Sequence, residues 1–365
     1  MPPVGSPIID TEQKRKAILR TCSYRRRDAE RTLIYLDADE KENLFARQQL
    51  PFNPLAPAKL GMLDRLPTEL LCEVLEQLDL ASLAAFRRAS RRAREVPTRT
   101  PKIARLMAHA LPQLAVLLRT GLAGRFTIST LHERLVGHPT CLQCGRMGSY
   151  VFLPTLSRCC LPCLRNSAAF AVVTMATVAR PAALVDLRPI EVRRCLRGMV
   201  LHTLPGTYSL DTYGQRWRPR VLVARVHARE MLRRVLGTSE SRAGMFLPGR
   251  FGGPWHAHHR YMAAMAFPWY NRARDELEHG VSCIGCGLGA LTHDQFLLHF
   301  DDCDEAREMW AESEPEVMAT ILKEARQDTE TLEVVRVPEV PAVPELLGFP
   351  GFPGLLTRRI SMPPG

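Results

Sequence analysis

The chain of 365 residues is 46% apolar, which is enough sequence for two or three domains and an ordinary composition for a globular protein. It has no run of about 18 apolar residues, and its first residues lack a basic stretch followed by an apolar one, so we expect neither a membrane span nor a secretory leader. The formal net charge is +11. A basic surface of this kind can bind nucleic acid or an acidic protein, or it can simply be exposed to solvent.

The charge is unevenly spread along the chain. Residues 141–245 hold 16 Lys/Arg against 5 Asp/Glu, whereas residues 246–365 hold 10 against 18. A basic middle region favours acidic or phosphorylated partners, although a solvated arginine-rich surface is the commoner reason for such a composition. Without a secretory leader we expect a reducing compartment, in which cysteines stay as thiols or bind metal.

Residues 1–60 are polar and punctuated by prolines, and the composition predicts a mostly disordered region with one helix near Arg31–Gln49. Two basic clusters in it resemble a bipartite nuclear import signal, Lys14-Arg15-Lys16 and Arg25-Arg26-Arg27. Such clusters are also common in basic proteins. We therefore expect the protein in the cytoplasm, the nucleus or both.

Residues 61–106 have the pattern of a helical hairpin. Pro67 suits the first turn of a helix and Glu69 complements its positive end. Asp79 offers an N-cap for a second helix, which ends in several arginines. The apolar positions recur at helical spacing on one face of each helix: Leu70, Leu71, Val74, Leu75 and Leu78 in the first, Leu80, Leu83 and Phe86 in the second.

This string resembles the F-box, a helical module of about 40 residues. The matching residues are Leu66-Pro67-x-Glu69-Leu70-Leu71, Asp79-Leu80, Leu83, Phe86 and Ser90-Arg91. The resemblance implies that the module binds the Skp adaptor of a cullin-RING ubiquitin ligase, with Leu78 and Phe86 in its own core. The implied adaptor contacts are Leu66, Pro67, Leu70, Leu71, Val74, Leu75 and Leu83. Val96-Pro97 stands where F-boxes often carry a tryptophan, which weakens the predicted third helix.

A first cysteine module, residues 141–180, follows a predicted helical linker over residues 107–140. Cys141, Cys144, Cys160 and Cys163 form the pattern C-x2-C-x15-C-x2-C, the spacing of a structural zinc site with four thiolates. Tyr150–Leu153 predicts a hairpin between the pairs, and the second pair is expected to open a helix over Asn166–Val178, as in a treble clef. Cys159 is a poorer alternative to Cys160.

The stretch Cys141–Cys163 also resembles a module that follows the F-box in many fungal F-box proteins, and Leu204-Pro205-Gly206-Thr207-Tyr208 is similar to a segment of the same group. Residues 181–279 are a mixed, basic region with a predicted helix at Val221–Val235. The histidine-rich stretch Trp255–His259 predicts a solvated loop more readily than a metal site.

Residues 280–326 hold a second metal-binding pattern that continues into a helix. Cys283, Cys286, His299 and Cys303 have the spacing of a single zinc finger with Cys as its last ligand. Phe296 occupies a core position, while Ala290 stands where fingers usually keep an aromatic. The three positions that would contact DNA bases are Thr292, Gln295 and Leu298, and the following acidic residues repel phosphate. The pattern therefore favours a structural or protein-binding finger.

Motifs of common enzyme classes are missing from the sequence. His132-Glu133 is not followed by the second histidine of H-E-x-x-H, and Pro162-Cys163 is not followed by the second cysteine that a zinc deaminase needs. The Pro- and Gly-rich residues 327–365 predict a disordered tail.

Together these patterns predict a mainly α fold with small β elements (α+β), in which an F-box module precedes a mixed region stabilised by one or two structural zinc ions. The resemblance implies a non-catalytic subunit that links a target protein to the Skp–cullin ligase, the target being acidic or phosphorylated if the basic region (Arg216, Arg218, Arg220, Arg225) binds it. The alternatives are a zinc-containing protein that binds nucleic acid, which the acidic second module disfavours, and a Skp-bound scaffold outside the ligase.

Overall fold

The computed structural model describes residues 11–49, 59–183, 186–209, 216–237, 247 and 254–334. Contacts divide the chain into two units. The larger is Ile8–Pro315, and the described part of the smaller is the end of one helix, residues 316–334. Among the helices described, none has the length and apolar character needed to cross a membrane.

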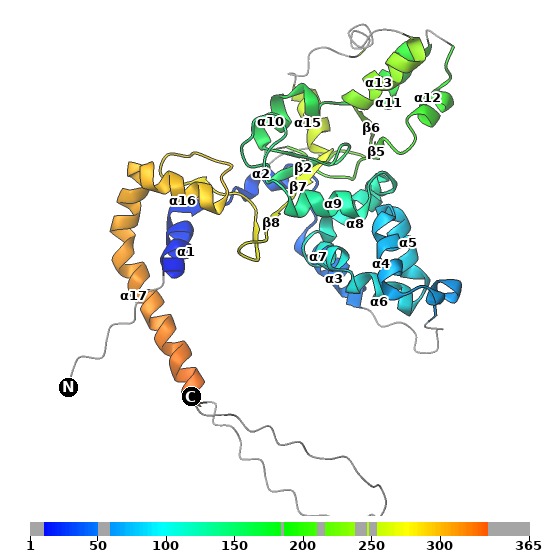
Figure 1. The fold of residues 1–365 in the computed structure, drawn as a ribbon. Coiled ribbons are helices and arrows are strands. Elements are labelled where there is room, and N and C mark those ends of the chain that lie inside the picture. Colours follow the sequence, from blue (N-terminus) through cyan, green and yellow to red (C-terminus); the bar gives the residue numbers. More distant parts are fainter. Residues whose placement is uncertain are drawn as a thin grey trace, which may run out of the picture. The chain divides into compact units, whose positions relative to one another are not determined.

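The N-terminal segment is ordered between residues 11 and 49, where the sequence predicts mostly disorder. It forms helices α1 (Thr11–Cys22), α2 (Arg27–Arg31) and α3 (Ala38–Gln49), which Figure 1 shows, and a short strand β1 (Ser23–Tyr24). Its few apolar side chains are buried in the core of the larger unit, Leu33 and Ile34 among them. Composition alone gives the wrong prediction here. The elements that stabilise this segment, such as strand β10 (Ser282–Cys283), lie far away in the sequence.

The predicted F-box region forms a 3-10 turn η1 (Gly61–Arg65) and helices α4 (Thr68–Gln77), α5 (Leu80–Ala89) and α6 (Arg91–Arg99). Asp79 caps α5 by accepting the N–H groups of Ala81 and Ser82, as predicted. The third helix forms despite Pro97, because the hydroxyl of Ser90 caps α6. The proline removes a single donor near the helix end, and Pro97 itself is buried.

Residues 101–136 are mainly helical and contribute to the hydrophobic core, whereas the sequence predicts only a helical linker over residues 107–140. They contain α7 (Pro101–His109), α8 (Leu111–Thr120), η2 (Ala123–Arg125) and α9 (Ile128–Val136). Leu80 N–H donates to Phe126 O at 2.9 Å, and Ile128 N–H donates to Leu78 O at 3.4 Å. These bonds join the F-box helices to the next segment, so one hydrophobic core spans both.

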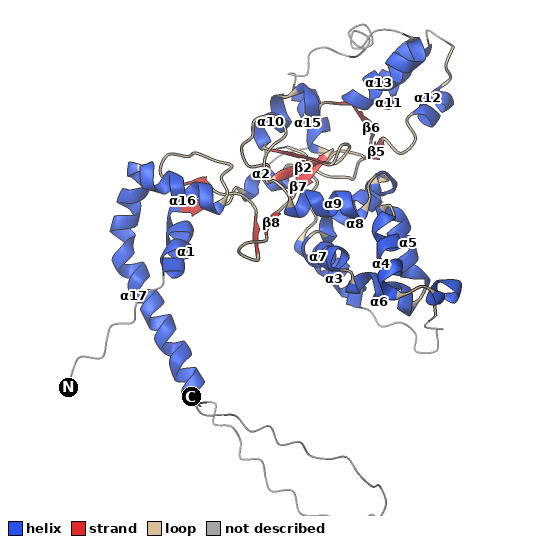
Figure 2. Cartoon of the chain, viewed as in Figure 1, coloured by secondary structure: helices blue, strands red, loops and turns tan. Residues whose placement is uncertain are grey.

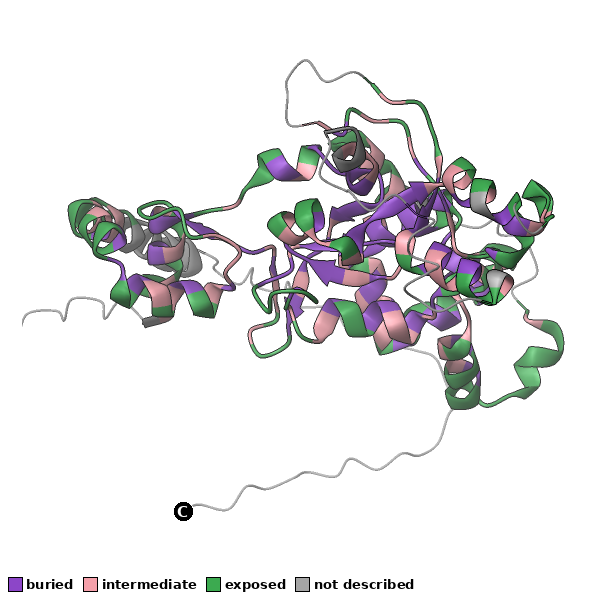
Figure 3. Ribbon diagram, turned by 90° about the horizontal axis from the view of Figure 1, so that it is seen from above, coloured by how far each residue is buried: buried purple, intermediate pink, exposed green. Residues whose placement is uncertain are grey.

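An antiparallel sheet in the order β3-β2-β7 follows, built from β2 (Tyr150–Phe152), β3 (Ser157–Cys159) and β7 (Ala264–Ala266). The β2–β3 hairpin confirms the predicted one, and its strands lie among the buried residues in Figure 3. The helix expected at Asn166–Val178 is wrong, because α10 (Leu161–Asn166) ends where that helix should begin. After η3 (Ala168–Phe170), the β-branched Val172 and Val173 extend into strand β4.

A second antiparallel sheet has the order β4-β6-β5, with β4 (Val172–Thr174), β5 (Val200–His202) and β6 (Val221–Ala224). It carries a smaller core with α11 (Met175–Ala182), α12 (Pro189–Cys195) and α13 (Arg225–Leu236). The helix predicted at Val221–Val235 therefore starts four residues late, because Val221–Ala224 pairs as the central strand.

The remaining elements are α15 (Pro254–Tyr261), β8 (Trp269–Asn271), β9 (Glu276–Glu278), α16 (His293–Asp302) and α17 (Asp304–Val334). Figure 2 shows how far helix outweighs strand, so the fold is mainly α with small β elements, as predicted. The stretch Trp255–His259 lies in helix α15, where the sequence predicts a loop. Helix α17 also continues beyond residue 326, and residues 335–365 of the predicted tail lie outside the described residues.

Candidate functional site

An apolar strip lies exposed on the F-box helices. It consists of Met62, Leu63, Leu66, Leu70 and Val74, of which Leu70 and Val74 are each 49% exposed. Leu70 and Val74 are four residues apart on α4, one helical turn, so they share one face. A second face of α4, about 100° around the helix from the first, buries Leu71 and Leu75 in the core. Helix α4 therefore has two apolar faces, and only one of them is covered within the described chain.

The predicted adaptor contacts divide into exposed and buried residues. Leu66, Pro67, Leu70 and Val74 are exposed, whereas Leu71, Leu75 and Leu83 are at most 3% exposed and belong to the chain's own core. The last three are thus placed to support a contact surface rather than to touch a partner. Sequence reasoning missed Met62 and Leu63, whose only signal was their apolar character just before Leu66-Pro67.

Ion pairs hold the strip in place at its ends. Arg92 Nε on α6 lies 2.6 Å from Asp64 Oδ1 in η1, and Lys102 Nζ on α7 lies 2.5 Å from Glu76 Oε2 on α4. The hydrogen bond from the Ser82 hydroxyl lowers the pKa of the capping carboxyl of Asp79. That carboxylate stays ionised near neutral pH and keeps the start of α5 next to the end of α4.

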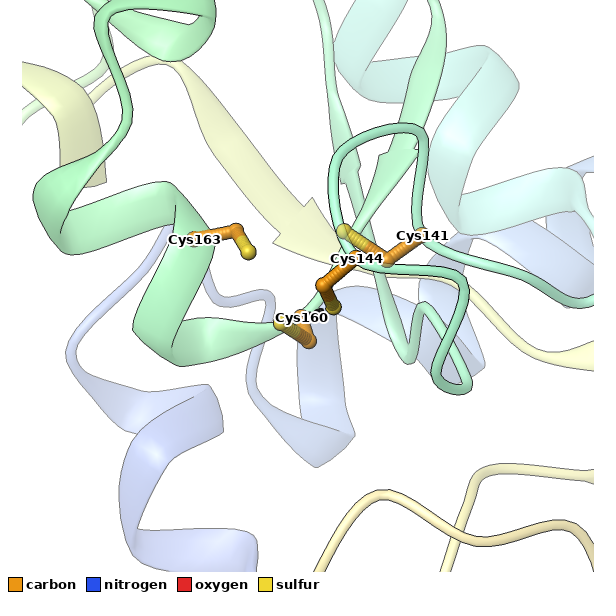
Figure 4. A group of neighbouring side chains, drawn as sticks. All are labelled: Cys141, Cys144, Cys160 and Cys163. Carbon is orange, nitrogen blue, oxygen red and sulfur yellow. Dashed lines mark hydrogen bonds between the residues drawn. The ribbon is translucent and has the colours of Figure 1, made fainter.

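The first cysteine cluster gathers the four predicted thiols. The sulfurs of Cys141, Cys144, Cys160 and Cys163 all lie within 4.8 Å of one another, and those of Cys144 and Cys160 are 3.6 Å apart. A tetrahedron with zinc–sulfur bonds of about 2.3 Å separates its sulfurs by about 3.8 Å. Figure 4 shows Cys141 and Cys144 on a loop and Cys160 and Cys163 at the start of α10. The group fits a zinc ion.

Cys160, and not its neighbour Cys159, belongs to the cluster. Cys159 is the last residue of β3 and is fully buried in the core. Burial raises the pKa of the Cys159 thiol well above its ordinary value, so this thiol stays neutral and behaves as a small apolar side chain. Cys160 is the N-cap residue of α10, which places its sulfur beside Cys144.

The guanidinium of Arg158 supports the hairpin that separates the two cysteine pairs. It is buried and donates to four carbonyl oxygens, those of Arg134, Gly148, Phe267 and Pro268, at 2.6–3.1 Å. It also lies over the ring of Phe267. Burial lowers the pKa of Arg158 to about 9. The four bonds tie α9, the knuckle loop and the end of β7 to one side chain.

The second cluster gathers Cys283, Cys286, His299 and Cys303, whose ligand atoms also lie within 4.8 Å of one another. The sulfurs of Cys283 and Cys303 are 3.9 Å apart, and Cys286 Sγ lies 3.2 Å from His299 Nε2. Three thiols and an imidazole at these distances suit tetrahedral zinc. Cys283 stands in β10, which pairs with β1, so the N-terminal segment helps to build this site.

The core of this second module differs from that of a common finger. Phe296 is fully buried, as predicted. Ala290, which occupies the usual aromatic position, has a left-handed backbone (φ +60°), and its carbonyl accepts the N–H of Met147 at 3.2 Å. This hydrogen bond between Met147 and Ala290 therefore connects the two cysteine modules within the larger unit.

The three positions that would contact DNA bases are used otherwise. Thr292 and Gln295 cap α16 reciprocally: the Thr292 hydroxyl accepts the Gln295 N–H, and the Gln295 side chain accepts the Thr292 N–H. The third position, Leu298, is a leucine and is 70% exposed. Two of the three side chains are thus engaged with the backbone of their own helix, and the third is apolar.

The basic cluster Lys14–Lys16 on α1 forms ion pairs with the acidic C-terminal third. Lys14 pairs with Glu314 at 2.8 Å and Arg15 with Asp294 at 3.0 Å. Lys16 lies 3.6 Å from Glu276. Part of the acidic charge of residues 246–365 is thus paired with basic residues of the N-terminal segment.

Comparison with known proteins identifies the helical module alone. The model of the F-box domain matches residues 63–101, which include α4, α5, α6 and most of the apolar strip. No curated protein matches the chain. No solved structure matches it either.

Proposed function

We propose that this F-box-containing protein is a substrate adaptor, which binds the Skp adaptor of a cullin-RING ubiquitin ligase and presents a target protein to it. The observation that carries the proposal is the exposed apolar strip inside the matched F-box. Five large apolar side chains lie in one short stretch, Met62 to Val74, and all are exposed. Exposed large apolar side chains concentrated in this way are typical of a protein-binding surface.

The adaptor performs no bond chemistry in this proposal. Its contribution is proximity, because a target held near the charged ubiquitin-conjugating enzyme presents its lysine at a high effective concentration. A rigid body between the two binding surfaces serves that purpose. The core shared by the F-box helices and the first cysteine module provides such a body.

Both cysteine clusters hold structural zinc in this proposal. Bound zinc would cross-link the knuckle loop Cys141–Cys144 to α10 and strand β10 to α16. Four protein ligands complete the coordination shell in each cluster and leave no position for a reacting water. Because the four ligands of each cluster come together only in the folded chain, metal binding would contribute directly to the free energy of folding.

The target would be an acidic or phosphorylated protein, because arginine binds such groups through charge-assisted hydrogen bonds. Arg216, Arg218 and Arg220 are exposed, whereas Arg225 is half-buried. Nucleic acid is the less favoured partner. In the second module Thr292 and Gln295 are engaged in capping α16, and the next helix begins with acidic residues.

For localisation we propose the cytoplasm, the nucleus or both. The ion pairs of Lys14–Lys16 would have to open before an import receptor could bind this cluster.

Co-expression with the Skp adaptor and pull-down tests the proposal. Wild type should bind stoichiometrically, and Leu70→Glu combined with Val74→Glu should abolish binding, because both side chains would place charge in the interface. The same chains should keep their zinc and their helical content, since the two side chains are exposed. Leu66→Glu with Pro67→Ala should have the same effect.

Leu298→Glu is the matched control, because Leu298 is an exposed leucine outside the F-box. It should leave Skp binding unchanged. Failure of a folded, zinc-loaded wild type to bind Skp would overturn the adaptor function and move nucleic-acid binding to first place.

A further inference from the structure

The outer side of α16 in the second cysteine module carries a large apolar side chain without cover. Leu298 is 70% exposed, and among the large apolar side chains that the structure describes only Met62 is more exposed. The opposite side of the helix is held in the module by two buried residues, Phe296 and Phe300. One apolar face is enough to pack a helix, so the packing of α16 does not need Leu298.

Carboxylates surround Leu298 on this outer side. Asp294 lies four residues before it, and Asp301 and Asp302 lie three and four residues after it, positions that share one face of a helix. Asp294 is paired with two arginines. Asp301 and Asp302 are exposed and have no ion pair among the described residues. Two carboxylates are thus left to solvent next to an uncovered leucine.

The position of Asp301 and Asp302 is unfavourable for the helix itself. Both lie in the last turn of α16, where the helix dipole is negative and favours cations. Neither these charges nor the exposed leucine therefore helps the module to fold. Local choices that work against the fold are typical of functional surfaces in natural proteins.

The metal-binding loop adds apolar side chains to the same module. Ile284 is 42% exposed and Leu288 is 40% exposed. This loop lies against the start of α17, because a Cβ on Gly285 would be only 2.8 Å from the Cβ of Glu305. Exposed apolar residues and acidic residues thus occur together in the loop and α17 as well as on α16.

We propose that the outer face of α16, formed by Leu298, Asp301 and Asp302, docks a basic segment of a partner protein in which lysine or arginine flanks an apolar anchor. Complementary charge selects this occupant. The anchor packs on the leucine, and the cations neutralise the two carboxylates, so one contact covers both unfavourable features. The surface goes beyond the adaptor function, and its chemistry is the reverse of that of the arginines proposed to hold the target.

A second copy of this chain is the competing occupant, because residues 141–245 carry an excess of basic residues. Such a contact joins two different surfaces, and heterologous contacts that do not close into a ring continue into chains. A second copy would therefore make the molecular mass grow with protein concentration. Acidic segments and nucleic acids are disfavoured, because their charge has the same sign as the two carboxylates.

Fluorescence polarisation with the purified, zinc-loaded full chain tests the surface. The probes are three labelled peptide pools of equal length. The first combines Lys and Arg with Leu and Phe, the second has Glu in place of its cations, and the third has Ser in place of its apolar residues. The first pool should bind at least tenfold more tightly than the second and at least threefold more tightly than the third. Added salt should weaken its binding, because salt screens exposed charges.

Two changes on α16 should alter this binding in different ways. Asp301→Lys combined with Asp302→Lys should weaken binding of the first pool at least tenfold and strengthen binding of the glutamate pool. Lysines in the last turn suit the helix dipole, and a gain of binding to the second pool cannot come from misfolding. Leu298→Ser should weaken binding of the first pool at least fivefold at low and at high salt.

Matched controls come from exposed positions elsewhere in the chain. Asp39→Lys combined with Glu42→Lys reverses two exposed charges on α3, and Leu118→Ser changes a leucine on α8 that is 38% exposed. Both should stay within twofold of wild type. An equal loss in either control, or unchanged binding in Leu298→Ser, would overturn the α16 face. Equal affinity for the glutamate pool would overturn the basic partner.

Light scattering and zinc analysis of the same preparations complete the test. Wild type should keep the mass of a single chain as its concentration rises. Growth in mass that Asp301→Lys with Asp302→Lys removes would assign the face to a second copy and overturn the foreign partner. Zinc content identifies any loss caused by damage to the ligand His299, which follows Leu298 directly. Skp binding should be unchanged in every variant, because the face lies outside the F-box.

Discussion

At the scale of single residues, Arg158 shows how a buried charge is tolerated when each of its three nitrogens has a hydrogen-bond partner. Its guanidinium satisfies four carbonyl oxygens from three segments. A buried carbonyl that loses its donor costs on the order of 1–3 kcal/mol. The sequence contains no signal for this role, because an arginine next to two cysteines predicts a surface residue.

Arg158→Lys should therefore destabilise the protein by about 3 kcal/mol or more, because one ammonium group cannot reach all four carbonyls. Urea unfolding of the zinc-loaded chain measures the difference. The exposed Arg234, changed to lysine in the same way, should alter the free energy of unfolding by less than about 0.5 kcal/mol. Equal stability of Arg158→Lys and wild type would show that the four bonds contribute little.

His132 is a second buried residue with a measurable consequence. Its Nε2 lies 3.1 Å from Arg105 Nη1, and burial together with Arg105, Arg272 and Lys102 lowers its pKa from 6.5 to about 4, against a weak opposing effect of Glu76. Below pH 6.5 the unfolded chain binds a proton here that the folded chain does not, so stability falls as the pH falls toward 4.

His132→Gln should remove this part of the pH dependence. When the pH falls from 7.5 to 5.5, the free energy of unfolding of wild type should decrease by about 1 kcal/mol more than that of the variant. Urea unfolding at both pH values measures this difference. Any loss of zinc at the lower pH affects both proteins equally, because they contain the same cysteine clusters, and it therefore cancels in the comparison. An identical loss in the two proteins would mean that folding does not lower the pKa of His132.

At the scale of elements, strand β1 closes the second cysteine module although it is only two residues long. Ser23 pairs with Cys283, and Ile284 N–H donates to Cys22 O at 3.0 Å. Cysteine spacing was enough to predict which side chains gather in each cluster, because the spacing reflects local knuckle geometry. The N-terminal support was not predictable, because a pairing between residues about 260 apart leaves no local pattern.

Deletion of residues 1–24 should therefore lower the zinc content from two ions per chain to one. The deleted strand leaves Cys283 without its pairing partner and exposes the buried side of the second cluster. Metal analysis after gel filtration measures the ratio. Arg15→Ala should keep both ions, because an exposed ion pair contributes about 1 kcal/mol at most. Two ions in the truncated chain would contradict the role assigned to β1.

At the scale of the whole molecule, one hydrophobic core contains both the F-box leucines and the first cysteine module. Leu71, Leu75 and Leu83 belong to it together with Cys141 and Cys160, whereas Cys283 and Phe296 of the second module do not. The sequence predicted the α+β class and the F-box helices from local periodicity. It predicted a linker at 107–140, because periodicity shows that a helix has an apolar face but not which element covers it.

Loss of the first zinc site should therefore loosen the F-box, whereas loss of the second should not. Hydrogen exchange of the amides in α4 and α5 should become at least tenfold faster in Cys160→Ser. The matched variant Cys286→Ser also removes a single ligand, and exchange in α4 and α5 should match that of wild type. Equal rates in all three proteins would show that the two halves of the core unfold independently.

The pairing of β2 with β7 sets an order of events during synthesis on the ribosome. Helices α4 to α9 make contacts close in sequence and can pack as they emerge. Strand β2 can pair with β3 at once, but its other edge waits for residues 264–266, more than 100 residues later, which corresponds to roughly 5–20 s of elongation. Strand β1 waits longer still, for Cys283. The first strand to leave the ribosome is thus the last to pair, so the nascent chain exposes an open strand edge that chaperones would have to protect.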